Sequence, residues 1–139
     1  MSEAANVYRI LDASVNRARE AVRVLEDAVR FLADDETATR DLKRFRHDFC
    51  EAADRIPIRT RLEHRATESD VGTSVTARGE YTRKSVESIL TANFCRLQES
   101  LRSLEEFSKL AEPDLAPIFE QLRYRSYTLQ QTVHAACGL

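Results

Sequence analysis

The sequence has few of the residues that interrupt helices, with only three glycines and three prolines among 139 residues. They stand at Pro57, Gly72, Gly79, Pro113, Pro117 and Gly138. This scarcity leaves no room for frequent chain breaks. Long stretches of helix-forming residues therefore run between a small number of joints.

An excess of positive charge is also absent. The chain has 21 Lys and Arg against 23 Asp and Glu, for a net charge of -2, which argues against binding to nucleic acid or to a membrane surface. Local arginine clusters can still bind an acidic ligand. Only three of the basic residues are lysines, and the planar guanidinium of arginine suits two-point binding of phosphate or carboxylate. A GC-rich genome would produce the same bias.

Cysteine and histidine patterns are missing as well. The three cysteines are odd in number and lack CxxC spacing, and the three histidines lie far apart, so we expect free thiols and no structural zinc. No stretch of about 18 apolar residues occurs, and the start has no basic region followed by an apolar one. We expect a cytoplasmic protein with no membrane segment.

Apolar residues recur at helical spacing in four segments. They cover about residues 10–32, then about 42–56 before Pro57, then about 84–110, and finally the segment after Pro117. Charged residues occupy the other side of the first segment. The pattern predicts four amphipathic helices.

An internal repeat relates the two halves. ILDASVNRAREAVRVLEDAVRFLADD, from Ile10, aligns with ILTANFCRLQESLRSLEEFSKLAEPD, from Ile89, at an offset of 79 residues. The matched pairs include Arg17 with Arg96, Glu20 with Glu99, Arg23 with Arg102, Leu25 with Leu104, and Glu26 with Glu105. Phe45-Arg46-His47 matches Leu122-Arg123-Tyr124 more weakly.

Two such hairpins bury their apolar stripes best as an all-α four-helix bundle with a pseudo-twofold axis. We predict one domain over residues 1–139, with hairpins at about 8–56 and about 84–136. The long connection, 57–83, is placed over one end of the bundle as a lid. Apolar residues left over, such as Phe119 and Tyr127, leave a homodimer open.

The strongest sequence signal for a binding site is the pair of small polar residues Ser14 and Asn93. They occupy equivalent positions in the apolar arcs of their helices, and Arg17 and Arg96 follow one turn later. A structural role, as a helix cap or a buried hydrogen bond, is one explanation. The other is that both helices begin at the same end of the bundle, so that these groups and two positive helix ends converge on an anion.

The long connection adds polar groups to this hypothesis. Asp70 could hold Mg²⁺ or accept a proton, and Gly72 and Thr73 could present backbone amides and a hydroxyl to an oxyanion. Such strings are also common in ordinary turns. Glu80 and Arg83 are expected either to cap the third helix or to reach a ligand. No GxxxxGK[ST], GxGxxG or kinase catalytic-loop pattern occurs, so these residues alone indicate an anion-binding helical domain.

Longer strings resemble a known family. YRILDASVNRAREAVRVLED, LKRFRH, DVGT, ANFCRLQESLRSLEEFSKL and LRYRSYTL are similar to the small hydroxymethylpyrimidine phosphate kinases of thiamin biosynthesis, which occur alone or fused to thiamin phosphate synthase. The resemblance implies ATP-dependent, Mg²⁺-assisted phosphorylation of hydroxymethylpyrimidine phosphate to the diphosphate. It also implies thiamin phosphate synthase as a fused domain or pathway partner.

Site residues follow from the resemblance. It implies phosphate contacts by Arg17, Arg46, Arg83, Arg96 and Arg123, and a pyrimidine or phosphate contact by Asn93. Ser14, Gly72 and Thr73 are assigned to ligand binding, and Asp70, Glu80 and Glu99 are the metal or base candidates. The family often has Asn where this chain has Ser14, and Gly where it has Ala21.

Two other classes of function remain open at this point. A chorismate-mutase-like isomerase also gathers Arg and Glu between long helices. A non-catalytic interaction or regulatory module of a thiamin phosphate synthase would leave Arg17 and Arg96 in surface ion pairs of small energetic value.

Overall fold

The computed structural model describes residues 1–139, and its regular structure is entirely helical. The four long helices are α1 (Glu3–Asp27), α2 (Glu36–Ala53), α4 (Val86–Ala111) and α5 (Ala116–Ala136), and α1 continues into a π-helical turn, Ala28–Leu32. A short helix, α3 (Ile58–His64), follows α2. Single turns of 3-10 helix cover Thr67–Ser69, Val71–Ser74 and Pro113–Leu115. The prediction of an all-helical bundle is confirmed.

Side-chain caps begin three of the long helices. Ser2 accepts a hydrogen bond from the Ala5 amide at 3.2 Å, and Asp35 accepts one from the Ala38 amide at 2.7 Å. Ser85 and Ser88 form a reciprocal capping box at the start of α4. The expected cap by Glu80 and Arg83 is therefore wrong, because two serines closer to α4 supply it.

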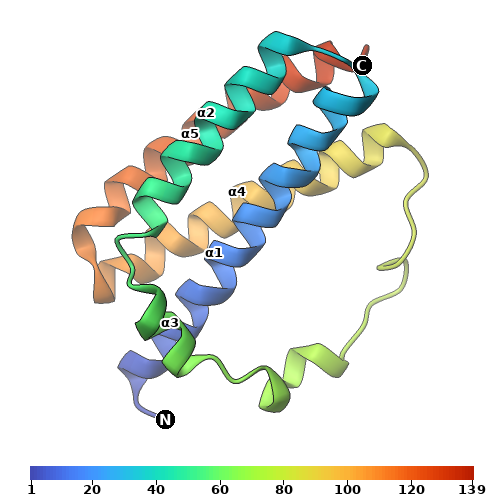
Figure 1. Cartoon of the computed structure of the whole chain (residues 1–139). Coiled ribbons are helices and arrows are strands. Elements are labelled where there is room, and N and C mark those ends of the chain that lie inside the picture. The colour runs from blue at the N-terminus through green and yellow to red at the C-terminus, as the bar shows by residue number, and fades with distance from the viewer.

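The bundle is centred on α1 and α4, which lie against each other; α2 packs on α1, and α5 packs on α4 (Figure 1). The two central helices run in opposite directions. Ser103, late in α4, lies beside the first half of α1, whereas Val86, early in α4, lies beside the end of α1. The prediction that both helices begin at the same end is therefore wrong.

The connection between the hairpins takes a longer path than expected. After Pro57, α3 packs against α1, and the chain then passes along the outside of the bundle to the opposite end (Figure 1). It has to do so because α4 begins at the far end from the start of α1. Only its first part, α3 and the turns after it, lies by the start of α1.

All four long helices contribute to one core cluster of 26 buried residues. Phe45, Phe49, Phe94 and Phe119 are its largest aromatic members, each at most 1% exposed. Phe119 is therefore core and does not contribute to a leftover apolar face as the sequence suggested, while Tyr127 remains 46% exposed. No helix combines the length and apolar character needed to cross a lipid bilayer.

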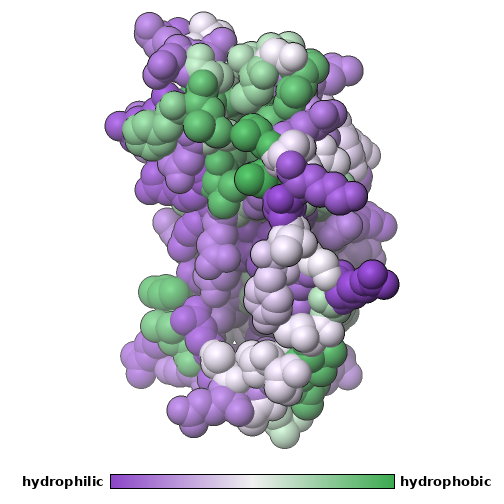
Figure 2. Space-filling model, turned by 90° about the vertical axis from the view of Figure 1, so that its right-hand side faces the viewer, coloured by the Kyte–Doolittle hydropathy of each residue, from purple (hydrophilic) through white to green (hydrophobic).

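Apolar side chains also gather on the surface where α1 ends. Val24, Phe31 and Leu32 meet Val86 and Ile89 of α4 in a shallow apolar hollow, which lies in the hydrophobic area at the upper end of the face in Figure 2. The guanidinium of Arg30 lies 4.8 Å from the centre of the Phe31 ring. This hollow is at the opposite end of α1 from the polar cavity described next.

Candidate anion-binding site

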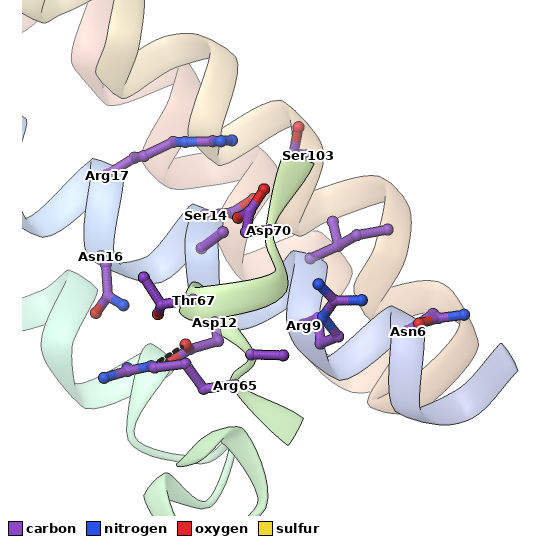
Figure 3. A pocket seen from close by; sticks show the side chains of 13 residues that line it. Asn6, Arg9, Asp12, Ser14, Asn16, Arg17, Arg65, Thr67, Asp70 and Ser103 are labelled. Atoms are coloured by element: carbon purple, nitrogen blue, oxygen red, sulfur yellow. Dashed lines mark hydrogen bonds and ion pairs between the residues drawn. The ribbon is translucent and has the colours of Figure 1, made fainter. Parts of the chain in front are cut away.

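A cavity of about 540 Å³ lies along the first half of α1, where the connection passes over it (Figure 3). Its walls come from three parts of the chain. They are Asn6, Arg9, Ile10, Asp12, Ala13, Ser14, Asn16 and Arg17 of α1, Arg65, Ala66, Thr67 and Asp70 of the connection, and Ser103 of α4. Three predicted site residues, Ser14, Arg17 and Asp70, are thus brought together.

Two cations of the cavity have no anionic partner in the chain. Arg9 and Arg17 stand two helical turns apart on α1, line the cavity and form no ion pair. Arg9 is half-buried and Arg17 is exposed. Both guanidinium groups are therefore free to bind an anion in the cavity.

The third cation is held by a carboxylate. Arg65 binds Asp12 at two points, from Nε to Oδ2 at 2.7 Å and from Nη2 to Oδ1 at 2.8 Å (Figure 3). This hydrogen bonding raises the pKa of Arg65. Asp12 is only 4% exposed, so the pair ties the connection to α1.

A fourth guanidinium lies behind this pair. Arg61 precedes Arg65 by one helical turn and is 2% exposed, and its Nη1 lies 3.5 Å from Oδ1 of Asp12. Its Nε and Nη1 have no hydrogen-bond partner. Burial lowers the pKa of Arg61, against the opposing effect of Asp12.

Ser14 is the most deeply buried polar residue of the cavity wall. It is 1% exposed, it lines the cavity, and its hydroxyl makes no hydrogen bond within the chain. Buried polar groups in proteins nearly always have a partner. With no partner in the chain, the Ser14 hydroxyl is available to a ligand in the cavity.

Asp70 lies at the cavity but is partly engaged by its own turn. Its Oδ1 accepts from the Gly72 amide at 2.8 Å, and its carbonyl accepts from the Thr73 hydroxyl at 2.8 Å. Gly72 and Thr73 thus shape the turn and do not line the cavity.

No group of three or more His, Cys, Asp or Glu side chains is arranged to hold a metal. A single carboxylate such as Asp70 binds Mg²⁺ only when ligand phosphates and water complete the coordination. Binding of Mg²⁺ at Asp70 therefore stays a prediction, and so does the use of ATP.

The other predicted residues of the connection and of α4 lie elsewhere. Glu80 accepts from the Ala77 amide at 3.0 Å, and Arg83 donates to the Thr82 carbonyl at 3.1 Å. Asn93 donates to the Ile89 carbonyl at 2.9 Å within α4, and Arg96 is exposed. Glu99 lines a separate hollow of about 250 Å³. None of them lines the cavity.

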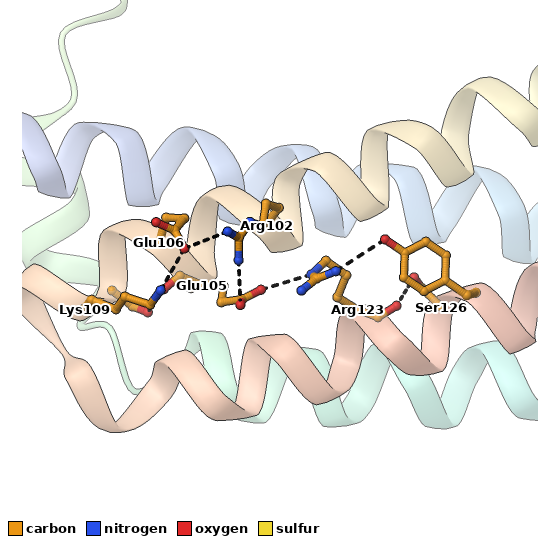
Figure 4. Close-up of polar contacts among 8 residues, drawn as sticks. Arg102, Glu105, Glu106, Lys109, Arg123 and Ser126 are labelled. Atoms are coloured by element: carbon orange, nitrogen blue, oxygen red, sulfur yellow. Dashed lines mark hydrogen bonds and ion pairs between the residues drawn. The ribbon is translucent and has the colours of Figure 1, made fainter.

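Arg46 and Arg123 also lie outside the cavity. Arg46 Nε donates to Glu26 at 2.8 Å, and Arg123 Nε donates to Glu105 at 3.0 Å (Figure 4). Hydrogen bonds to Tyr127 and Glu105 raise the pKa of Arg123. Both arginines brace a hairpin and neither lines the cavity, so their phosphate contacts stay a prediction.

Sequence reasoning missed four charged residues of this region: Arg9, Asp12, Arg61 and Arg65. The spacing of Arg61 and Arg65, four residues apart, places both on one face of a helix. That spacing was the available signal. Their shared partner Asp12 is 53 residues from Arg65, so only the fold pairs them.

Comparison with known proteins adds a family. The model of the ThiD2 family matches residues 9–132. The chain is 42% identical over 127 residues to a thiamine-phosphate synthase of Nostoc punctiforme, covering 91% of this chain and 35% of that protein. It is 40% identical over 126 residues to a thiamine-phosphate synthase of Rhodopirellula baltica, covering 91% of this chain and 34% of the relative. No solved structure matches.

These relatives correct one prediction. The resemblance implied a phosphomethylpyrimidine kinase, but the relatives are named thiamine-phosphate synthase, so the kinase assignment is wrong. The expected relationship to thiamin phosphate synthase is confirmed. The chain spans about a third of the length of these relatives. Its match over most of its length makes this chain a member of the ThiD2 family, related to thiamine-phosphate synthases.

Proposed function

We propose that this chain is a non-catalytic helical module of thiamin biosynthesis, which serves a thiamine-phosphate synthase and binds an anionic ligand of that enzyme. The cavity on α1 is the binding site. The observation that carries the proposal is that two guanidinium groups without an ion pair, those of Arg9 and Arg17, line the same cavity as the Ser14 side chain, which makes no hydrogen bond within the chain.

The chemistry of the cavity suits binding. Its two carboxylates are already engaged, Asp12 by Arg65 and Asp70 by the Gly72 amide. Apart from the guanidinium groups, the remaining polar lining consists of amide and hydroxyl side chains that donate and accept hydrogen bonds. Such a wall can recognise a polar, negatively charged small molecule without taking part in a reaction.

The relatives support the link to the synthase. In each of them the matched region is about a third of a longer protein named thiamine-phosphate synthase. A region of this size next to an enzyme can hold a phosphorylated substrate or product close to the active site. Thiamine phosphate, which the name of the relatives supplies, is therefore the first ligand to test.

The isomerase alternative is not favoured. It requires glutamates that face the ligand together with arginines, and no glutamate lines the cavity. Of the repeated glutamates, Glu26 and Glu105 are buried against Arg46 and Arg123.

The test combines binding with activity. Isothermal titration of the chain with thiamine phosphate should give saturable binding at one site, and an R9A/R17A variant should lose it. The chain is then added to a purified thiamine-phosphate synthase, whose rate or KM should change with the wild-type chain and not with the variant. Absence of binding at millimolar ligand, or equal binding by the variant, would refute the site. An unchanged synthase would refute the proposed partnership.

A further inference from the structure

We infer that Arg65 is the third ligand-binding guanidinium of the cavity, and that a phosphate dianion draws it away from Asp12 while the buried Arg61 takes over that carboxylate. The inference rests on the proposed function, since it requires an anion in the α1 cavity. It adds the charge of the ligand and the rearrangement that accompanies binding.

Arg65 is placed to exchange partners. Its side chain is 39% exposed and lines the cavity, although both of its hydrogen bonds go to Asp12. Asp12 is buried, so its carboxylate stays in place when Arg65 moves toward the cavity. An anion in the cavity therefore competes with Asp12 for the same planar set of N–H donors.

Arg61 is placed to replace Arg65 as the partner of Asp12. A buried charged group whose N–H donors lack acceptors is costly, and Arg61 has two such nitrogens, Nε and Nη1. The separation of 3.5 Å between Nη1 and Asp12 Oδ1 is just beyond good hydrogen-bond length. A shift of the Arg61 guanidinium by about half an ångström would form a hydrogen bond from Nη1 to Asp12. Arg65 holds both oxygens of Asp12 by hydrogen bonds and leaves Nε and Nη1 of Arg61 without one.

Like charges favour the same exchange. Arg61 faces Arg19 and Arg65 as well as Asp12 and Asp54, and the positive charge of Arg65 disfavours the protonated form of Arg61. Arg19 is already paired with Asp54 at 3.7 Å. Movement of Arg65 toward a bound anion would reduce its repulsion of Arg61 and free the acceptor that Arg61 lacks.

The charge balance identifies the class of ligand. Four guanidinium groups, Arg9, Arg17, Arg61 and Arg65, stand against the carboxylates of Asp12 and Asp70. Two positive charges are left over, which match a phosphate monoester or free phosphate in its dianionic form. A carboxylate ligand would neutralise only one of them.

The first test uses the wild-type chain and follows the arginine Nε–H resonances by NMR while thiamine phosphate or inorganic phosphate is added. We expect the Nε–H signals of Arg61 and Arg65 both to shift with the same saturation curve. The Arg59 signal should not move, because Arg59 is on the same helix but points to solvent and pairs with Glu63. Tighter binding of thiamine phosphate than of inorganic phosphate would assign a contribution to the organic part.

The second test uses titration calorimetry of R61M, R65M and the matched control R59M. R61M should bind phosphate about tenfold more weakly although Arg61 does not line the cavity, a coupling of ordinary size for linked sites. R59M should bind like the wild type. The R61M/R65M double variant should bind no more weakly than R65M, since Arg61 acts only through the release of Arg65.

The outcomes separate the two proposals. Phosphate binding by the wild type with unmoved Arg61 and Arg65 signals would overturn the inference and leave the binding site intact. Acetate binding as tight as phosphate binding would overturn the assignment to a dianion. No binding of either phosphate probe would overturn the proposed function and the inference together. The NMR test does not depend on the folding of any variant.

Discussion

Arg46 donates from Nε to Oε2 of Glu26 over 2.8 Å and thereby joins α2 to α1. The equivalent residues of the second hairpin, Arg123 and Glu105, form the same bond between α5 and α4 at 3.0 Å (Figure 4). The glutamate side chains are 3% and 5% exposed. The most regular part of the internal repeat therefore encodes a brace within each hairpin.

Loss of this brace should destabilise the fold. Arg46→Met leaves the carboxylate of Glu26 buried without a partner, and we expect a decrease of about 3 kcal/mol in the free energy of unfolding. Urea unfolding followed by circular dichroism measures it. Arg44→Met, on the same helix but exposed and without an ion pair, is the control and should change the value by less than about 0.5 kcal/mol. Equal effects of the two substitutions would argue against the brace.

The two repeated arginines should differ in function. Arg17 lines the cavity, whereas Arg96 is exposed on α4 and does not line it. Arg17→Ala should weaken binding of thiamine phosphate by more than about tenfold, since a hydrogen bond to a charged group contributes about 1.5–3 kcal/mol. Arg96→Ala should bind as the wild type does, and both variants should melt within a few degrees of it. Weaker binding by the Arg96 variant would place the site on α4 instead.

Ser14 should matter for the ligand and not for the fold. Its hydroxyl makes no hydrogen bond within the chain, so Ser14→Ala removes no such bond and should leave the free energy of unfolding nearly unchanged. The affinity for the phosphate ligand should fall by about three- to tenfold, because one neutral hydrogen bond is lost. Ser100→Ala, at a buried serine of α4 outside the cavity, is the control for both measurements. A Ser14 variant that unfolds readily would indicate a structural hydrogen bond.

Cys137 should make the fold sensitive to alkaline pH. Burial, followed by the charge of Asp35, raises the pKa of its thiol. The folded state then holds the thiol proton more tightly than the unfolded state, whose thiol titrates near pH 8.5. This contribution to stability is complete below that pH and is lost as the pH rises through the higher folded value.

The measurement compares melting temperatures between pH 7 and pH 10. The wild type should lose more stability over this range than Cys137→Ala, while Cys95→Ala, at an exposed position, should follow the wild type. In line with this, iodoacetamide at pH 8 should modify Cys95 before Cys137. Faster modification of Cys137 would contradict the effect of burial.

The helices and their duplication could be predicted from the sequence alone. Apolar residues at helical spacing act over a few positions, so the existence of the four long helices could be read locally, although α1 begins at Glu3 and α2 at Glu36, both earlier than their apolar stripes indicate. Ser14, Arg17 and Asp70 were also recognised as site residues and do share a cavity. Local patterns carried these predictions because each depends on neighbours within one or two turns.

Which copy of the repeat carries the cavity depends on long-range packing. Arg17 and Arg96 are equivalent in the sequence, yet α3 packs on α1 and brings Arg61 and Arg65 to Asp12 beside Arg17. At the matching end of α4, the surface is the apolar hollow that contains Phe31 and Val86. Because α1 and α4 run in opposite directions, the two copies cannot meet at one end. The contacts that make the site join residues about 50 positions apart, and no local pattern encodes them.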